Sequence, residues 1–237
     1  MLPSVANINP RSVYNKSEEF VTFVTNITNG GLDIAFISES FERPDFPLED
    51  MLKEHREMED YDIFSNPHQR NGKGGRPAMV IKRGRYHIQN LTNTLLTIPW
   101  GVEAVWTLLT PLNASNSSNI QKIACCAFYS RPKSTAPQRA ALLDHITESF
   151  HILSTKYSKG LHFIIAGDAN KLRLAPILQL CPQMRSVVEQ PTRLGEPGSP
   201  PAMLDPILTT LAGYYQPPVV LPPLDLDPGS GGKLQTT

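Results

Sequence analysis

The sequence is poor in cysteine, has no net charge and contains no long hydrophobic run, and each absence excludes a class of protein. Only 3 of its 237 residues are cysteines, and two of these are adjacent, so neither a disulfide framework nor a zinc-binding CxxC pair is formed. A reduced compartment is the simpler inference. The 22 basic and 22 acidic residues cancel, so any surface that binds nucleic acid must be local.

Targeting segments and the common hydrolase motifs are missing too. No stretch approaches the roughly 18 apolar residues of a membrane span, and the first residues lack the basic and apolar parts of a signal peptide. We therefore expect an intracellular protein, nuclear and cytoplasmic, with no membrane partner. The chain also has no HExxH motif, no Walker A loop and no Gly-x-Ser-x-Gly elbow.

Apolar runs and amphipathic stretches alternate, which is typical of an α/β domain. One helix is predicted from Ser17, which caps it, to the glycines at 30–31, and a buried strand follows at 33–38. A second helix is predicted over residues 138–157, with a buried strand at 161–166. Four strand-like segments lie between these units, at residues 78–82, 86–91, 103–110 and 120–129, and their polar turns predict antiparallel hairpins.

Two packed sheets flanked by helices explain this order better than one parallel sheet does. Residues 1–216 are assigned to one such domain. Residues 217–237 are rich in Pro and Gly and are assigned to an extended C-terminal loop and tail.

Polar residues follow several of the predicted strands, where loops of α/β folds collect catalytic groups. They are Asn9, Glu39, Tyr129, Asp168 and Asn170, and a further acid, Asp205, precedes an apolar strand. Phosphodiester cleavage needs a divalent cation and an activated water. A Mg²⁺ site needs only one or two carboxylates, so Glu39 suits it, while Asp168 suits activation of the water. Asn170 is a candidate for holding a phosphate oxygen, and Tyr129 for donating to the developing charge.

Each residue also has a plainer interpretation. Asn9 precedes Pro10 and suits a turn, and Glu39 precedes an acidic stretch. Either Asp168 or Asn170 is suited to capping a following helix, and Tyr129 to the core.

Taken in order, the motifs resemble those of endonuclease domains of LINE-type (non-LTR) retrotransposons, in the endonuclease/exonuclease/phosphatase family. Residues 9–16 resemble the family's Asn-x-Arg-Ser-Leu-x-x-Lys opening, and residues 36–40 its "ITET" motif. The later motifs are similar at residues 74–81, 102–106, 128–134, 166–170, 191–193 and 204–209.

The resemblance implies a four-layer α/β sandwich and a nuclease that nicks DNA with Mg²⁺ or Mn²⁺, within a polyprotein that includes a reverse transcriptase. It implies that Asn9 and Glu39 lie on the phosphate and metal side and that Tyr129 stabilises the transition state. Asp168 and Asn170 become the pair that activates and orients water, and Asp205 the acid that supports a catalytic histidine.

The chain departs from the family at its end. The family's last motif, Ser-Asp-His, has no counterpart here, and none of the six histidines follows Asp205. We therefore expect the last strand of the sandwich to be missing and the activity to be impaired. A catalytically inactive module that binds nucleic acid or protein is the alternative. A phosphoesterase acting on phosphoinositides, sphingomyelin or RNA tails is a third interpretation, which the motifs at residues 9–16 and 191–193 disfavour.

A basic segment between residues 70 and 85 is the candidate for binding a phosphate backbone. It holds Arg70, Lys73, Arg76, Lys82, Arg83 and Arg85 and no acid. A solvated hairpin is the alternative. Arg131 and Lys133, next to Tyr129, are further candidates.

Overall fold

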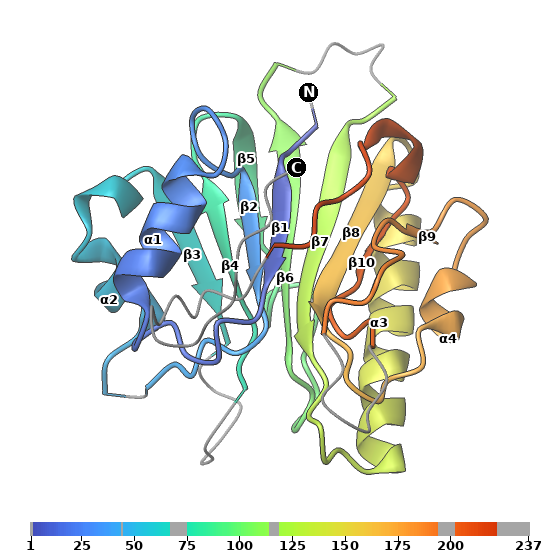
Figure 1. Ribbon diagram of the computed structural model, residues 1–237. Coiled ribbons are helices and arrows are strands. Elements are labelled where there is room, and N and C mark those ends of the chain that lie inside the picture. The colour runs from blue at the N-terminus through green and yellow to red at the C-terminus, as the bar shows by residue number, and fades with distance from the viewer. Residues whose placement is uncertain (1, 44, 67–74, 114–118, 194–201, 222–237) are drawn as a thin grey trace.

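The computed structural model describes residues 2–43, 45–66, 75–113, 119–193 and 202–221. Two β-sheets pack face to face, and helices cover the outer face of each, which gives four layers (Figure 1). The four-layer α/β sandwich expected from the sequence is therefore confirmed.

The first sheet has the strand order β1-β2-β4-β3. Its strands are β1 (Val5–Ile8), β2 (Ile34–Ile37), β3 (Tyr61–Ser65) and β4 (Ala78–Lys82). Strands β1 and β2 are parallel, and the other pairs are antiparallel. Its outer face is covered by α1 (Ser17–Asn26), α2 (Leu48–Lys53) and the short helix η1 (Arg56–Met58).

The second sheet has the order β5-β6-β7-β8-β10-β9. Its strands are β5 (Tyr86–Asn90), β6 (Ala104–Pro111), β7 (Lys122–Tyr129), β8 (Leu161–Asp168), β9 (Arg185–Ser186) and β10 (Ile207–Thr209). Only β7 and β8 pair in parallel. The helices α3 (Ala136–Lys156) and α4 (Ala175–Leu178) lie on its outer face, and η3 (Ala212–Tyr214) follows β10.

Strand β2 is buried along its whole length, because neighbouring side chains of a strand point to opposite faces and both faces are covered. Ile34 and Phe36 pack between the two sheets, whereas Ala35 and Ile37 pack beneath α1 and α2. The adjacent cysteines divide in the same way. Cys125 lies between the sheets and Cys126 faces α3, and both are free and fully buried.

Most predicted elements are confirmed, and two details are corrected. Helix α1 is capped at Lys16 and not by the side chain of Ser17, which already lies inside the helix. The chain passes from one sheet to the other between β4 and β5, so these two strands form no hairpin. The reason is that β4 pairs with β2 and β3 in the first sheet, whereas β5 pairs with β6 in the second. Strands β5, β6 and β7 do form the expected antiparallel meander.

The parallel strand pairs of the two sheets, β1–β2 and β7–β8, end at the same end of the molecule, and this places the candidate residues together. Ile8 pairs with Ile37 at the end of β1 and β2, and Tyr129 pairs with Asp168 at the end of β7 and β8. The polar residues that follow these strands therefore gather over the same edge.

No helix in the described ranges is long and apolar enough to span a membrane. Residues 217–221 form neither helix nor strand, and the remainder of the predicted tail lies outside the described residues.

Candidate functional site: an acidic and amide cluster where the sheets meet

Two hydrogen bonds between side chains join the sheets over this edge. The hydroxyl of Tyr129, from the second sheet, donates to Oε1 of Glu39, which follows β2, over 2.5 Å. The amide Nδ2 of Asn9, which follows β1, donates to Oδ2 of Asp168 at 3.0 Å. Four of the six residues singled out from the sequence are thus directly bonded in pairs.

Asp168 is the centre of the cluster and is only 4% exposed. The backbone N–H of Asn170 donates to its Oδ1 at 2.9 Å, so both carboxylate oxygens accept a hydrogen bond. The Asn170 side chain in turn donates to the backbone carbonyl of Ser130 at 2.8 Å. Asn170 itself has a φ of 44°, a left-handed conformation that asparagine tolerates. The turn after β8 is therefore stabilised by hydrogen bonds that Asp168 and Asn170 form.

Glycine is required directly before Asp168. A Cβ atom on Gly167 would collide with the backbone carbonyl of Phe128 on the neighbouring strand β7. The Gly-Asp sequence thus lets β8 approach β7 closely enough to place the carboxylate beside Tyr129.

Asp205 joins the cluster from the segment before β10. The hydroxyl of Thr192 accepts hydrogen bonds from the backbone N–H groups of Leu204 and Asp205, at 3.0 and 3.1 Å. The backbone N–H of Ala169 donates to the carbonyl of Leu204 at 2.7 Å, which ties this segment to the turn after β8.

The electrostatics of the cluster are dominated by buried negative charge. Burial, followed by the charge of Asp205, raises the pKa of Asp168 to about 7. Burial also raises the pKa of Asp205, and the charge of Glu39 adds to the effect. The pKa of Tyr129 is raised as well, first by burial and then by its hydrogen bond to Glu39, so this phenol stays protonated as a donor. The ion pairs found among the described residues involve Asp33, Glu49, Asp62 and Glu103, not these three acids.

Asn7 is a member of the cluster that the sequence reasoning missed. Its Nδ2 donates to the carbonyl of Gly167 at 3.0 Å and to that of Pro206 at 3.2 Å, so it connects β1 with the segments that carry Asp168 and Asp205. Its position two residues before Asn9, on the same face of an extended chain, was the available signal.

Two oxygens in this region fit a hard cation. Oδ1 of Asn7 and Oδ1 of Asp205 are both buried and have no hydrogen-bond partner, which is costly unless a ligand satisfies them. Within the described ranges, no group of three or more His, Cys, Asp or Glu side chains is arranged to bind a metal jointly. A Mg²⁺ ion needs only one or two carboxylates and retains several waters, so the oxygens of Glu39, Asp205 and Asn7 suffice.

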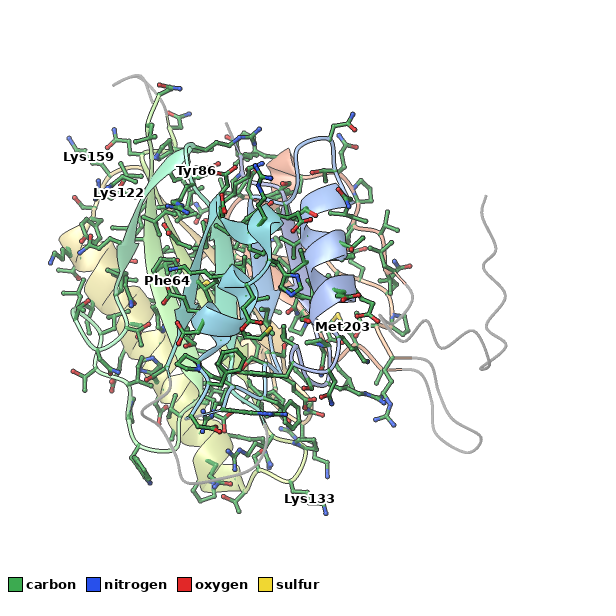
Figure 2. The ribbon with its side chains drawn as sticks, turned by 90° about the vertical axis from the view of Figure 1, so that its left-hand side faces the viewer. Phe64, Tyr86, Lys122, Lys133, Lys159 and Met203 are labelled. Carbon is green, nitrogen blue, oxygen red and sulfur yellow. The ribbon has the colours of Figure 1, made fainter. Side chains whose placement is uncertain are left out.

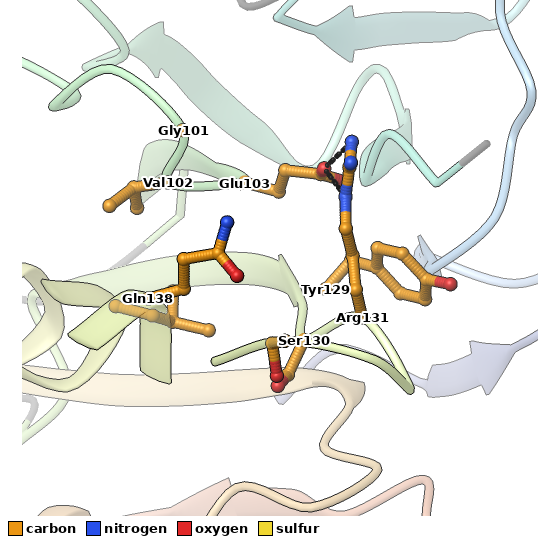
Figure 3. A pocket seen from close by; sticks show the side chains of 9 residues that line it. Gly101, Val102, Glu103, Tyr129, Ser130, Arg131 and Gln138 are labelled. Carbon is orange, nitrogen blue, oxygen red and sulfur yellow. Dashed lines mark hydrogen bonds and ion pairs between the residues drawn. The ribbon is translucent and has the colours of Figure 1, made fainter. Parts of the chain in front are cut away.

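A second polar network beside the cluster was also missed. Oε1 of the buried Glu103 accepts from Nε of Arg131 at 2.7 Å and lies 2.5 Å from Nη2 of the same guanidinium (Figure 3). Oε2 accepts from the backbone N–H of Arg76 at 3.0 Å. Ser40 completes it, because its backbone N–H and its hydroxyl both donate to the carbonyl of Arg76. The network fixes residues adjacent to Glu39 and Tyr129.

A cavity of about 20 Å³, large enough for a single water, lies beside this network (Figure 3). It is lined by Gly101, Val102, Glu103, Tyr129, Ser130, Arg131, Ser134, Gln138 and Leu142. It therefore brings together the turn before β6, the loop after β7 and the first turn of α3.

The plainer interpretations hold only in part. Oδ1 of Asn9 accepts from the backbone N–H of Arg11 at 3.2 Å, so Asn9 does form a turn while it also binds Asp168. Neither Asp168 nor Asn170 caps α4, whose N-cap is Leu174. Among the described histidines, His145 is buried against Trp106 and His162 bonds to Thr210, as expected of core and surface residues.

The structure does not bring the basic segment to the cluster. Lys82 lies at the opposite end of β4 from Ala78, which pairs with Ile37 beneath the cluster. Arg85 forms an ion pair with Asp33 at 2.9 Å, and Nε of Arg83 lies 3.6 Å from Asp62. Only Arg76 lies near the cluster, and Arg70 and Lys73 lie outside the described residues.

Lys133 lies in the loop after β7, at the cluster's end of the molecule. Figure 2 shows it at the opposite end from Tyr86, the neighbour of Arg85.

No protein-family model and no curated protein matches the sequence. Solved structures do share the fold. AP endonuclease LMAP from Leishmania major aligns with a TM-score of 0.61 at 15% identity, over 89% of this chain and 80% of that chain. An endonuclease/exonuclease/phosphatase from Bacteroides vulgatus aligns with a TM-score of 0.57 at 12% identity, over 88% and 87%. TDP2 from D. rerio, in complex with a single-strand DNA product, aligns with a TM-score of 0.51 at 15% identity, over 90% and 85%.

These similarities establish that the chain has the fold of endonuclease/exonuclease/phosphatase proteins.

Proposed function

We propose that this protein is a metal-dependent phosphodiesterase that cleaves DNA as an endonuclease. The observation that carries the proposal is the meeting of Glu39, Asp168 and Asp205 at the edge where the two sheets pack, with raised pKa values for both aspartates. Buried acids whose pKa values are perturbed by burial and by one another are characteristic of functional sites. The fold shared with an AP endonuclease and with a DNA-bound TDP2 supports DNA as the substrate.

The ligands of a Mg²⁺ or Mn²⁺ ion would be the oxygens of Glu39, Asp205 and Asn7. When bound, the ion would supply charge neutralisation for the scissile phosphate. Asn9, expected beside the metal, already uses both ends of its amide, for Asp168 and for Arg11. We assign it instead to orienting Asp168.

The remaining residues have distinct roles in the reaction. Asp168 has a pKa near neutrality, which suits a general base that takes a proton from the attacking water. The backbone N–H of Asn170 and the side chain of Asn9 hold its carboxylate in one orientation. Tyr129 remains protonated and donates its O–H to a negatively charged group, which in the free protein is the Glu39 carboxylate.

A retrotransposon origin, with a reverse transcriptase in the same polyprotein, is supported by the ordered sequence motifs alone. A second candidate function is a catalytically inactive module that binds nucleic acid. One observation favours it: the side-chain hydrogen bonds of the described histidines go to Trp106, Thr210 and Asn119, and none goes to Asp205.

The test is nicking of supercoiled plasmid in Mg²⁺ or Mn²⁺ by the intact protein and by Asp168→Asn. Nicking that disappears in the folded variant supports the phosphodiesterase. Folded wild-type protein that binds DNA without nicking it supports the inactive module instead.

A thermal-unfolding titration with the same ions tests the metal site separately. Both ions are expected to raise the melting temperature of the wild-type protein, and Glu39→Gln is expected to abolish the increase. An increase that persists in Glu39→Gln would overturn the assignment of Glu39 to the metal.

A further inference from the structure

The two tryptophans of the chain have opposite environments. Trp106 is completely buried beneath α3, where its indole N–H donates to Nε2 of His145 at 3.1 Å. Trp100, in the loop between β5 and β6, has 74% of its surface exposed. Leaving so large an apolar ring in water forfeits the free energy that its burial would provide, unless a ligand covers it.

The loop that carries Trp100 is well anchored. Ile98 and Val102, on either side of it, are both buried in the core of the second sheet. The backbone N–H of Val102 donates to the carbonyl of Pro99 at 3.1 Å, and that of Ile98 to the side chain of Asn93 at 3.2 Å. The indole is thus presented on a fixed turn, and a ligand that covers it loses little conformational entropy of the protein.

This turn lies beside the acidic cluster. Glu103 directly follows it, and the backbone N–H of Tyr129 donates to the carbonyl of Glu103 at 3.0 Å. Gly101, the neighbour of Trp100, lines the same cavity as Tyr129 and Arg131 (Figure 3). The loop after β7 adds the exposed Lys133 there, together with Arg131, which is partly exposed while its guanidinium pairs with the Glu103 carboxylate.

We propose that Trp100 stacks on an unpaired nucleobase of a DNA strand whose phosphates contact Arg131 and Lys133. Every base has a π-face, so an exposed indole beside basic side chains is the arrangement that binds single strands without regard to sequence. The inference rests on the proposed function in one respect: the DNA strand is taken to run from Trp100 towards Asp168. It adds that the substrate has unpaired bases next to the site of cleavage.

The test is a titration of the full chain with a short single-stranded oligodeoxynucleotide, in EDTA so that no cleavage occurs. The tryptophan fluorescence of the protein and its affinity for the oligonucleotide are measured in the same titration. Because Trp106 is buried, any quenching is expected to come from Trp100, and Trp100→Phe removes it. Trp100→Ala is expected to weaken binding about 5- to 140-fold, which corresponds to the roughly 1–3 kcal/mol of one stacked base.

The matched control is Tyr214→Ala. Tyr214 is also an exposed aromatic, at 62%, but it follows β10 at the end of the molecule opposite the cluster. Its removal is expected to leave both affinity and quenching unchanged. A duplex of the same sequence is expected to quench Trp100 less than the single strand does.

Binding of the single strand with unchanged Trp100 emission and unaltered affinity in Trp100→Ala would overturn the stacking site, whatever the nicking assay shows. Absence of any DNA binding would overturn both the stacking site and the proposed function. Quenching by the single strand in a protein that nicks nothing retains the stacking site and rejects only the phosphodiesterase.

Discussion

The hydroxyl of Tyr129 donates to Oε1 of Glu39 over 2.5 Å, and this bond is one of those that join the two sheets of the sandwich at the candidate site. The two residues are 90 positions apart in the chain: Tyr129 ends β7 of the second sheet, and Glu39 follows β2 of the first. Their contact therefore exists only when the sheets have packed against each other. The orientation of Glu39 thus depends on the same interface that holds the fold together.

Replacing Tyr129 by Phe is expected to remove this bond and leave Oε1 of Glu39 short of a donor. Loss of one partner of a charged hydrogen bond costs about 1–3 kcal/mol. Urea unfolding should show a decrease of that size in the free energy of unfolding. In a Glu39→Gln background the same Tyr129→Phe change should cost less, and an equal cost in both backgrounds would mean that the ring's packing, not the bond, is responsible.

Gly75 is expected to tolerate no side chain. It has a φ of +78°, and a Cβ atom there would lie 2.7 Å from the ring of Tyr129 and also collide with the Glu103 carboxylate. Gly84 is a matched control, because it has a φ of +89° but a Cβ atom there would meet nothing within 4 Å. Gly84→Ala should cost about 1–2 kcal/mol, the backbone strain alone, and Gly75→Ala more than that.

Nicking activity distinguishes the two glycine variants further. Gly75→Ala should lower it, because the displaced Tyr129 carries Glu39 with it, whereas Gly84→Ala should leave it intact. Equal losses of stability and activity in the two variants would contradict the close packing at Gly75.

The stability of the protein is expected to fall in mild acid because of His145. Burial lowers the pKa of this imidazole to about 4, and it accepts the indole N–H of Trp106 in its neutral form. The unfolded chain takes up the proton below about pH 6.5, whereas the folded protein does so only near pH 4. The contribution of neutral His145 to the free energy of unfolding is therefore fully present above pH 6.5. It is lost as the pH falls to 4, and the whole decrease is on the order of 3 kcal/mol.

Urea unfolding at several pH values measures this effect. His145→Gln keeps an acceptor for Trp106 but does not titrate, so its stability should change less between neutral pH and pH 5. An identical pH dependence in the variant would assign the acid sensitivity to other groups.

Two basic residues at opposite ends of the molecule are expected to differ in DNA binding. Lys133 is exposed in the loop after β7, whereas Arg83 lies near Asp62 at the far end of β4. Lys133→Ala should weaken binding for every sequence and reduce the slope of log affinity against log salt by about 1, the loss of one phosphate contact. Arg83→Ala should leave the slope unchanged, and the reverse result would restore the basic segment as the binding surface.

Local patterns were enough for the sequence to predict most of the elements and an arrangement of two packed sheets flanked by helices, although α2 and β3 were not predicted. The helix over residues 138–157 and the strand over residues 161–166 appear as α3 and β8, because apolar periodicity and glycine punctuation act over a few residues. The ordered motifs likewise pointed to the four-layer sandwich and to Asn9, Glu39, Tyr129, Asp168, Asn170 and Asp205.

Only the tertiary structure decided how these residues are used. Sequence proximity grouped Lys82, Arg83 and Arg85 with Arg76 in one basic segment, but an extended strand carries its two ends far apart, and these three residues lie at the end away from the cluster. Asn7 has only its two-residue spacing from Asn9 as a local signal and Glu103 has none, because their partners come from β8 and from the loops before β4 and after β7. The pairing of Tyr129 with Glu39 follows from the same cause: it depends on how two sheets face each other, and no local pattern encodes that.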